Sequence, residues 1–315
     1  MSRILVLLLL SASTLAAAQA TPPCCPAATN EKLDVFWHKL EATIHDADRN
    51  LDGVMGVAIL DLTSGQSILL HPDDVFPQAS SIKITVLAEL YRQAGEGKLK
   101  LDDLYTVQQS DIVPDSWIME GLTPGVTRIT LRDLATMMIA VSDNSATNVL
   151  IDRVGMENVN AMLDGLGLHN TRLRRKMMDL NAAKQGRENI STPREMMTLL
   201  ETIFRGKLLN HQMTIEFFKM LSTAKNSPIR LAVPDNIVSA DKPGELEAVR
   251  NDSGVVFAQN RPFIICVMTT YLLNEDAGND TIRRIAAAAY SYFDRVGRAS
   301  PYGRVISPNN NSSPK

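Results

Sequence analysis

The sequence has 315 residues, of which 45% are hydrophobic and 21% are charged, and its formal net charge is −3. This composition is typical of a globular protein with a sizeable core, so it excludes a disordered chain, a collagen-like repeat and a small disulfide-rich scaffold. The slight negative charge and the 5% aromatic content also argue against a nucleic-acid partner, which needs basic patches or stacking platforms.

The N-terminal segment predicts export. Arg3 precedes the apolar run 4–10, and small residues follow up to the tripeptide Ala-Gln-Ala at 18–20. This pattern indicates a signal peptide over 1–20, cleaved near Ala20, and a periplasmic or secreted protein. The alternative is a membrane anchor, but the apolar run is short for a span, and no later run is long enough for one.

Hydrophobic periodicity predicts the order of the secondary-structure elements. A helix is expected at 31–47, and two strands at 54–62 and 66–70 flank a turn. The elements expected in the middle of the chain are all helical: 81–94, 131–140, 145–155, 193–205 and 211–222. The elements expected after them are three strands and a last helix: 229–239, 247–258, 262–271 and 281–296.

This order favours an α+β fold. The two ends of the chain can share one antiparallel sheet covered by the terminal helices, with the middle of the chain inserted as a helical part and a cleft between the two. Capping signals support two helix starts, at Thr130 with Asp133 and at Thr192 with Glu195. The predicted division is a signal peptide (1–20), a Pro-rich leader (21–30), an α/β part (31–72 and 227–297), a helical part (73–226) and a loose tail (298–315).

Cysteine and histidine give no sign of a cross-linked core or a metal site. Cys24 and Cys25 are adjacent in the leader, and Cys266 lies in an apolar run, where a buried thiol is expected. The five histidines have no carboxylate pattern around them, and no glycine-rich nucleotide motif is present. We therefore expect no metal and no cofactor.

Ser80 and Lys83 form a first stretch that can carry chemistry, at a predicted helix start. Side chains three positions apart share a helical face, so the lysine can take the proton of the serine hydroxyl. The N–H groups at the helix start can stabilise an oxyanion. Alone, the spacing is expected by chance about once per chain, where it marks only a capped helix with a surface lysine.

The tripeptide Ser142-Asp143-Asn144 lies between two predicted helices. The Ser142 hydroxyl can relay a proton, and the Asn144 amide can both donate to and accept from an acyl-amide substrate. Asp143 is expected to brace the loop by accepting from backbone N–H groups. The competing interpretation is a simple interhelical turn.

A third stretch, Lys242-Pro243-Gly244, enters a predicted strand. Its cation can bind a substrate carboxylate, and its glycine can let a ligand approach the backbone. A plain β-turn is the alternative. In this order, the three stretches resemble the signature of class A β-lactamases and penicillin-binding proteins.

The resemblance to the class A β-lactamase family covers nearly all of the mature chain. It includes Phe76-Pro77, the run S-D-N-S-A-T-N at 142–148 and Arg250-Asn251-Asp252. It implies a five-stranded antiparallel sheet with flanking helices, an all-helical part and a serine hydrolase site between them. It also implies a small-molecule substrate, a β-lactam or an acyl-D-Ala-D-Ala-like compound, and no cofactor.

The resemblance implies a role for each matching residue. Ser80 is the nucleophile that becomes acylated, Lys83 is its base or proton relay, and Ser142 hands a proton to the leaving β-lactam nitrogen. The resemblance further implies that Asn144 binds the side-chain amide of the substrate, and that Lys242 with Gly244 binds its carboxylate, with Arg250 as a second partner. It implies that Trp117 forms an aromatic wall. The backbone N–H groups of Ser80 and Glu245 would form the oxyanion hole.

Two departures from the family pattern bear on turnover. The stretch 171–181 resembles the family's Ω-loop and retains Asn181, but Met177 stands where the family has the Glu that positions the deacylating water. A thioether cannot accept that proton, and general-base help is typically worth ~10²–10⁴-fold. Asp179 is the alternative base. Pro243 removes a hydroxyl and a backbone N–H from the carboxylate pocket.

Three functions stay open at this point. The first is a class A-type β-lactamase, slow at deacylation, that uses Asp179 or a differently placed water. The second is a serine hydrolase of another acyl compound, such as a D-Ala-D-Ala peptide, an ester or an amide. The third is a penicillin-binding or scaffold protein without turnover. The oligomeric state and the substrate spectrum are not encoded in any pattern we find.

Overall fold

The computed structural model describes residues 31–305. The signal peptide expected at 1–20, the leader with Cys24 and Cys25, and the end of the tail (306–315) lie outside the described residues. None of the helices between 31 and 305 is long and apolar enough to cross a membrane.

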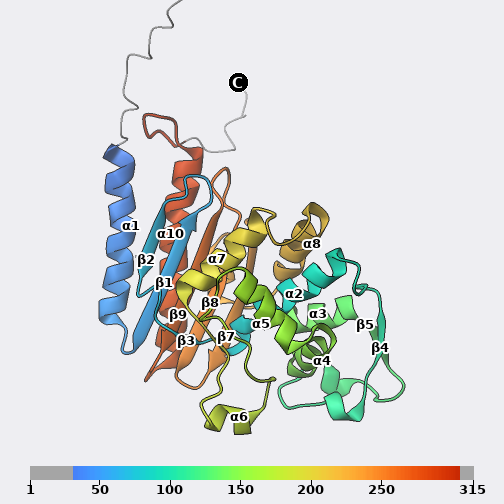
Figure 1. Ribbon diagram of the computed structural model, residues 1–315. Coiled ribbons are helices and arrows are strands. Elements are labelled where there is room, and N and C mark those ends of the chain that lie inside the picture. Colours follow the sequence, from blue (N-terminus) through green and yellow to red (C-terminus); the bar gives the residue numbers. More distant parts are fainter. Residues whose placement is uncertain (1–30, 306–315) are drawn as a thin grey trace, which may run out of the picture.

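A five-stranded antiparallel sheet organises the fold, as the sequence predicts (Figure 1). Its strands are β1 (Val54–Asp61), β2 (Ser67–Leu70), β7 (Ser239–Leu246), β8 (Val249–Val256) and β9 (Phe263–Thr270). Their order is β2-β1-β9-β8-β7, so β1 from the start of the chain pairs along its whole length with β9 from the end. Strand β7 is therefore an edge strand.

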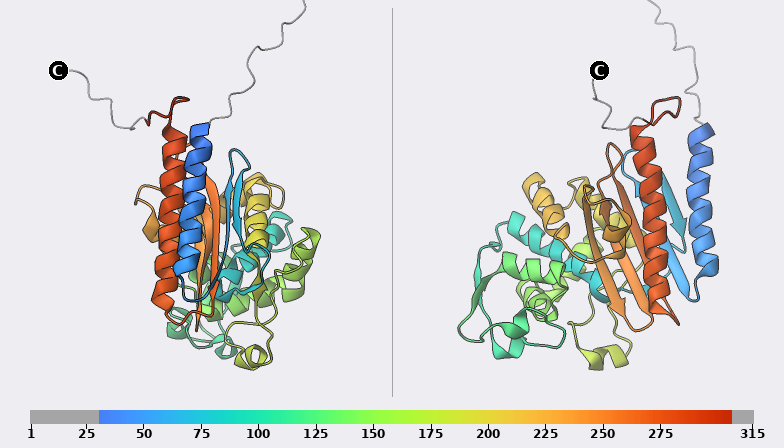
Figure 2. Two further views of the ribbon diagram at one scale, coloured as in Figure 1. Left: turned by 90° about the vertical axis from the view of Figure 1, so that its left-hand side faces the viewer. Right: turned by 180° about the vertical axis from the view of Figure 1, so that it is seen from behind.

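The two terminal helices cover one face of the sheet. α1 (Glu31–Asn50) and α10 (Glu275–Arg298) lie side by side there (Figure 2). Their apolar stripes, with Trp37 and Ile44 on α1 and Phe293 on α10, are buried against the sheet. Burial of apolar surface on this face holds the two ends of the chain together.

The helical part covers the other face. Its helices are α2 (Lys83–Gly95), α3 (Leu131–Ala140), α4 (Asn144–Val154), α5 (Met156–Gly165), α6 (Leu180–Lys184), α7 (Pro193–Phe204) and α8 (His211–Leu221). The short helix α9 (Pro228–Ala232) instead packs against α10 on the face of the terminal helices. The short elements of the helical part are β3 (Phe76–Pro77), η1 (Ala79–Ile82), β4 (Leu104–Thr106), η2 (Gln109–Asp111), η3 (Met119–Gly121), β5 (Arg128–Thr130) and β6 (Ile190–Ser191). α2 is nearly all buried, and it places η1 at the boundary between the two parts.

The two predicted caps are confirmed. The Thr130 and Thr192 hydroxyl oxygens accept from the backbone N–H groups of Asp133 and Glu195, each at 3.1 Å. Cys266 is fully buried as a free thiol, as expected, and burial raises its pKa to about 12.

The strand predicted at 229–239 is wrong. Ser227 caps the short helix α9 there, with Pro228 in its first turn, and the strand starts only at Ser239. Apolar and β-branched residues suggested a strand, but a serine cap followed by proline is a helix-start signal that outweighed them.

Candidate active site

Ser80 lies in η1, which runs directly into α2, so Lys83 follows it by one helical turn. The preceding residue, Ala79, has a φ of 50°, a left-handed conformation that is costly for a residue with a Cβ. The Gln78 backbone N–H donates to the carbonyl oxygen of Asn189 at 2.8 Å and holds this turn in place. Strained backbone kept in place by its surroundings is typical of functional sites.

Lys83 is fully buried, and its ammonium group is directed at the Ser142 tripeptide. Its Nζ donates to the carbonyl oxygen of Ser142 at 2.6 Å, and lies 3.0 Å from both Ser142 Oγ and Asn144 Oδ1. Burial lowers the pKa of Lys83 well below its usual value, and the charge of Lys242 adds to this. A neutral amine carries a lone pair, and of these three partners only the Ser142 hydroxyl has a proton to share with it.

Asp143 braces the loop, as expected. It caps α4 by accepting from the N–H of Ala146 at 2.9 Å, and its second oxygen accepts from Ile118 at 3.0 Å and Met119 at 2.9 Å. The neighbouring Ser142 has a φ of 58°. The carboxylate therefore fixes both the strained loop and the segment that carries Trp117.

Lys242 is the second buried cation of the site, with 2% of its surface exposed. Burial lowers the pKa of Lys242 to about 8, and the positive charge of Lys225 contributes. Its Nζ donates to the carbonyl oxygen of Pro243 at 2.9 Å.

The structure gives a different reason for a glycine at position 244 from the one expected. A Cβ there would lie 2.6 Å from the Gln78 carbonyl oxygen and 2.8 Å from the Ser81 nitrogen. The glycine thus lets β7 approach η1, the segment with the nucleophile, rather than opening space for a ligand.

Two cavities meet at Ser80, of about 340 Å³ and about 140 Å³. Four residues line both: Ser80, Asp115, Asn144 and Glu245. The larger cavity is completed mainly by Trp117, Ser142, Lys225, Asn226, Lys242 and Pro243. The smaller is completed mainly by Ala79, Arg175, Met177, Met178, Leu180 and Leu246. Trp117 lines the larger cavity and is 77% exposed.

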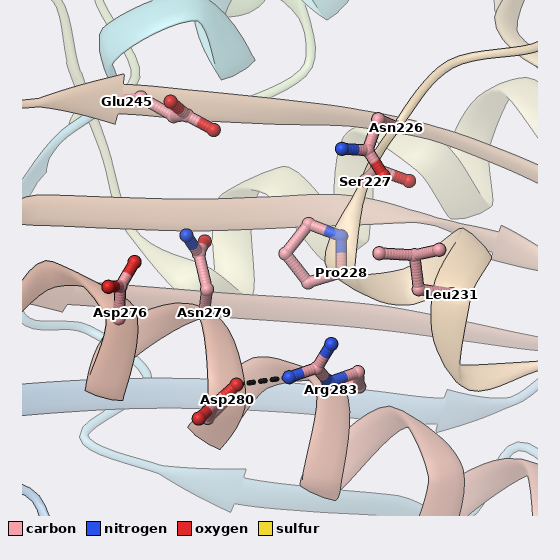
Figure 3. Close-up of a pocket in the computed structure, with 9 residues that line it drawn as sticks. All are labelled: Asn226, Ser227, Pro228, Leu231, Glu245, Asp276, Asn279, Asp280 and Arg283. Carbon is pink, nitrogen blue, oxygen red and sulfur yellow. Dashed lines mark hydrogen bonds and ion pairs between the residues drawn. The ribbon is translucent and has the colours of Figure 1, made fainter.

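A third cavity of about 400 Å³ is also lined by Glu245 (Figure 3). It shares Glu245 and Asn226 with the larger Ser80 cavity, and residues of α9 and α10 complete it. Glu245 therefore borders all three cavities.

Arg250 lies away from the site. Its guanidinium pairs with Glu275 and donates to the carbonyl oxygens of Leu246 and Val249, each at 2.8 Å. Its side chain runs beside Gly278 of α10, and it lines neither Ser80 cavity. The geometry therefore does not support Arg250 as a second carboxylate partner, because this side chain is on the α10 side of the sheet.

The stretch 171–181 brings a thioether, not a carboxylate, to Ser80. Met177 is held by paired bonds with Asn148: its N–H donates to Asn148 Oδ1 at 2.8 Å, and its carbonyl accepts from Asn148 Nδ2 at 3.1 Å. Asp179 instead caps α6, accepting from Ala182 at 2.9 Å. It lines a neighbouring cavity, which Ser80 does not line but which shares Arg175, Met177 and Met178 with the smaller Ser80 cavity. Asn181 is exposed and lines neither Ser80 cavity.

Among the residues that the sequence missed at this site are Asp115, Lys225 and Asn226, which belong to no motif. The signal that marks one of them, Asp115, is a positive backbone φ angle. Of the eight non-glycine residues with positive φ between 31 and 305, four line the Ser80 cavities: Ala79, Asp115, Ser142 and Met178. Strain gathered in this way marks the site independently of the motifs.

Comparisons with known proteins agree with this geometry. The family model described as "Beta-lactamase enzyme family" matches residues 39–293. Beta-lactamase SME-1 of Serratia marcescens is 28% identical over 265 residues, covering 80% of this chain and 88% of its own length. The carbapenem-hydrolyzing beta-lactamase KPC of Klebsiella oxytoca is 31% identical over 262 residues, covering 79% and 86%.

Solved structures are similar as well. An ancestral (GNCA) class A beta-lactamase has a TM-score of 0.75 and 27% identity, covering 81% of this chain and all of its own. PBP-A has a TM-score of 0.74 and 26% identity, covering 81% and 96%. A mutant of PBP-A, also with a TM-score of 0.74 and 26% identity and covering 82% and 97%, is an acyl-enzyme complex with penicillin G.

Proposed function

Since the chain belongs to the class A β-lactamase family, we propose that it is an exported serine hydrolase that opens β-lactams through an acyl-enzyme on Ser80. One observation carries the proposal. Buried Lys83 is hydrogen-bonded to Ser142 and Asn144, directly beside the larger cavity, which Ser80 and Lys242 both line.

Acylation uses this arrangement as a proton circuit. Neutral Lys83 takes the proton of the Ser80 hydroxyl while Oγ attacks the carbonyl carbon of the β-lactam. The oxyanion is held by the backbone N–H groups of Ser80 and Glu245. When the C–N bond breaks, Ser142 gives its proton to the nitrogen, and Lys83 returns the proton from Ser80 to Ser142.

Substrate binding divides between the two walls of the site. Lys242 attracts the carboxylate of the substrate, Asn144 pairs with its side-chain amide, and Trp117 covers the larger cavity. Gly244 acts indirectly, because the close contact of β7 with η1 sets the position of Glu245 relative to Ser80. Pro243 offers no hydroxyl, so Lys242 carries most of the carboxylate binding.

Deacylation is the slow step in this proposal, because Met177 and Met178 line the Ser80 cavity where a base is needed. The same observation favours a second candidate function, a D-Ala-D-Ala peptidase or a penicillin-binding protein without turnover. The penicillin G acyl-enzyme of the similar PBP-A mutant supports the capacity of such a site to be acylated.

Intact-protein mass spectrometry during incubation with benzylpenicillin tests the proposal. We expect the protein to gain the mass of one penicillin and to lose it again slowly. Ser80→Ala, which removes only the nucleophile, should gain no mass while keeping its melting temperature. A wild-type protein that stays unmodified while the penicillin stays intact, or an adduct on the alanine variant, would contradict the proposal. A permanent adduct would favour the second function.

Acylation of a carboxylate-bearing β-lactam should weaken at alkaline pH. Lys242, with a pKa of about 8, is charged below that pH and loses its charge above it. The acylation efficiency should therefore fall as pH rises through about 8, by about tenfold per pH unit at the limit. Rate constants measured from neutral to alkaline pH check this.

Lys225→Met provides the matched control for that profile. The charge of Lys225 lowers the pKa of Lys242, so its removal should move the alkaline fall to higher pH. A flat wild-type profile, or a shift to lower pH in the variant, would exclude Lys242 as the titrating group.

A further inference from the structure

We propose that Lys225 is the second partner of the substrate carboxylate, in the role predicted for Arg250, so that the carboxylate binds between the ammonium groups of Lys225 and Lys242. This inference rests on the proposed acylation of Ser80. It names a residue, outside every motif, that makes the site prefer anionic β-lactams.

The larger Ser80 cavity lacks the carboxylate partners that the sequence predicts beside Lys242. Arg250 is paired with Glu275 on the α10 side of the sheet. Pro243 has neither a hydroxyl nor a backbone N–H. Of the basic residues between 31 and 305, only Lys225 and Lys242 line this cavity. Lys225 is therefore the one other cation placed to contact a carboxylate there.

Lys225 is held at the cavity by the end of a helix. Its Nζ donates to the carbonyl oxygen of Leu221, the last residue of α8, at 2.7 Å. A cation is favoured at this position by the helix dipole. Because the side chain is partly buried, water screens its charge less than that of a surface lysine.

Both ammonium groups keep hydrogen-bonding capacity for a ligand, since each has three N–H donors. Among residues 31–305, Lys225 Nζ bonds only to the Leu221 carbonyl, Lys242 Nζ bonds only to the Pro243 carbonyl, and neither forms an ion pair. The charge of Lys225 also lowers the pKa of Lys242, so the two groups repel each other. A carboxylate between them relieves this repulsion and uses the remaining donors.

The nearest buried carboxyl groups, those of Asp241 and Asp252, do not neutralise the two lysines. They accept from the Ser227 hydroxyl and the Ile229 N–H, and they line neither Ser80 cavity. Burial and the charge of Asp241 raise the pKa of Asp252 well above its ordinary value. The two together therefore carry less than two negative charges.

Two further carboxylates, those of Asp115 and Glu245, do line the larger cavity. Both side chains are exposed, so water and salt screen their charges. The excess of positive charge therefore lies where the side chains are more buried, around Lys225 and Lys242. That end of the cavity suits an anion.

Benzylpenicillin and its methyl ester test this assignment, because they differ at the carboxylate alone. The readout is the ratio of their acylation efficiencies at pH 7, followed by intact-protein mass spectrometry. We expect the wild-type protein to react faster with the acid than with the ester. Lys225→Met should lower this ratio by about tenfold, since it removes a charge-assisted hydrogen bond. A general change in acylation rate cancels in the ratio.

The direction of the change separates direct contact from an effect through Lys242. With a pKa of about 8, Lys242 is mostly charged at pH 7, and removal of the Lys225 charge would raise that pKa. If Lys225 acted only through Lys242, the ratio would therefore stay the same or rise slightly in Lys225→Met.

Three further variants assign the effect to the charge at position 225. Lys225→Arg keeps the charge and should retain most of the preference. Lys225→Gln should lower the ratio as methionine does, and it keeps the test decisive if the methionine variant does not fold. Lys219→Met, at an exposed position of α8 that lines neither Ser80 cavity, should leave the ratio unchanged.

The outcomes distinguish this inference from the proposed function. An unchanged or higher ratio without the Lys225 charge, an equal fall in Lys219→Met, or an arginine variant as impaired as the methionine variant would overturn the role of Lys225 while acylation of Ser80 stands. A wild-type protein that neither gains mass from benzylpenicillin nor consumes it would overturn the proposed function and this inference with it.

Discussion

Met177→Glu is expected to shorten the lifetime of the Ser80 acyl-enzyme by about 10²–10⁴-fold, the usual contribution of a general base. Met177 lines the smaller Ser80 cavity, and its backbone is fixed by two hydrogen bonds with Asn148. A carboxylate on that backbone would face the ester bond and could activate a water molecule. The decay of the penicillin adduct, followed by mass spectrometry, measures the effect.

Two variants show whether the carboxylate itself is responsible. Met177→Gln has nearly the same size and polarity but no base, so it should leave the adduct long-lived. Asp179→Asn should change the lifetime little, because the Asp179 carboxylate caps α6 and lines the neighbouring cavity beyond Met177 rather than a Ser80 cavity. Met177 is only 7% exposed, so the melting temperature of each variant is needed. Fast decay in the glutamine variant would disprove the missing-base explanation.

Lys83→Met is expected to slow acylation by about 10²–10⁴-fold while the protein still binds the substrate carboxylate at Lys242. Methionine replaces the lysine stem but has no amine to take a proton from Ser80 or to return one to Ser142. Stopped-flow acylation with the same penicillin measures the loss.

The same substitution should also lower the free energy of unfolding. It leaves the carbonyl oxygen of Ser142 and Oδ1 of Asn144 without their buried donor, which costs about 1–3 kcal/mol for each unpaired group. Lys98→Met, at an exposed position, serves as the control and should alter neither quantity. Wild-type acylation in the Lys83 variant would exclude Lys83 from the proton circuit.

Local sequence signals predicted much of the fold. Hydroxyl caps at Thr130 and Thr192, apolar stripes on the terminal helices and apolar β-type runs gave the correct architecture, because each signal acts within a few residues. The failure at 229–239 came from a segment in which an apolar run competed with the Ser227 and Pro228 start signal.

The candidate site was predictable only where its residues belong to motifs. Ser80, Lys83, Ser142, Asn144 and Lys242 all lie at the cavities or in direct contact with their residues. Arg250 also matched a motif, but strand geometry and Glu275 take it to the other side of the sheet. Asp115 could not be predicted, since its position depends on a strained turn anchored by hydrogen bonds to distant Ser145.

The pairing of β1 with β9 has a consequence for how the protein acquires activity. Asp61 and Phe263 are neighbours in the sheet although 202 positions separate them in the chain. Such non-local pairing slows folding, because a long loop must close before its contacts form. Ser80 is synthesised early, but β7 and β9, which complete its surroundings, come last. The surroundings of the nucleophile are therefore complete only after nearly the whole chain has been synthesised, and the active site is among the last features of the molecule to form.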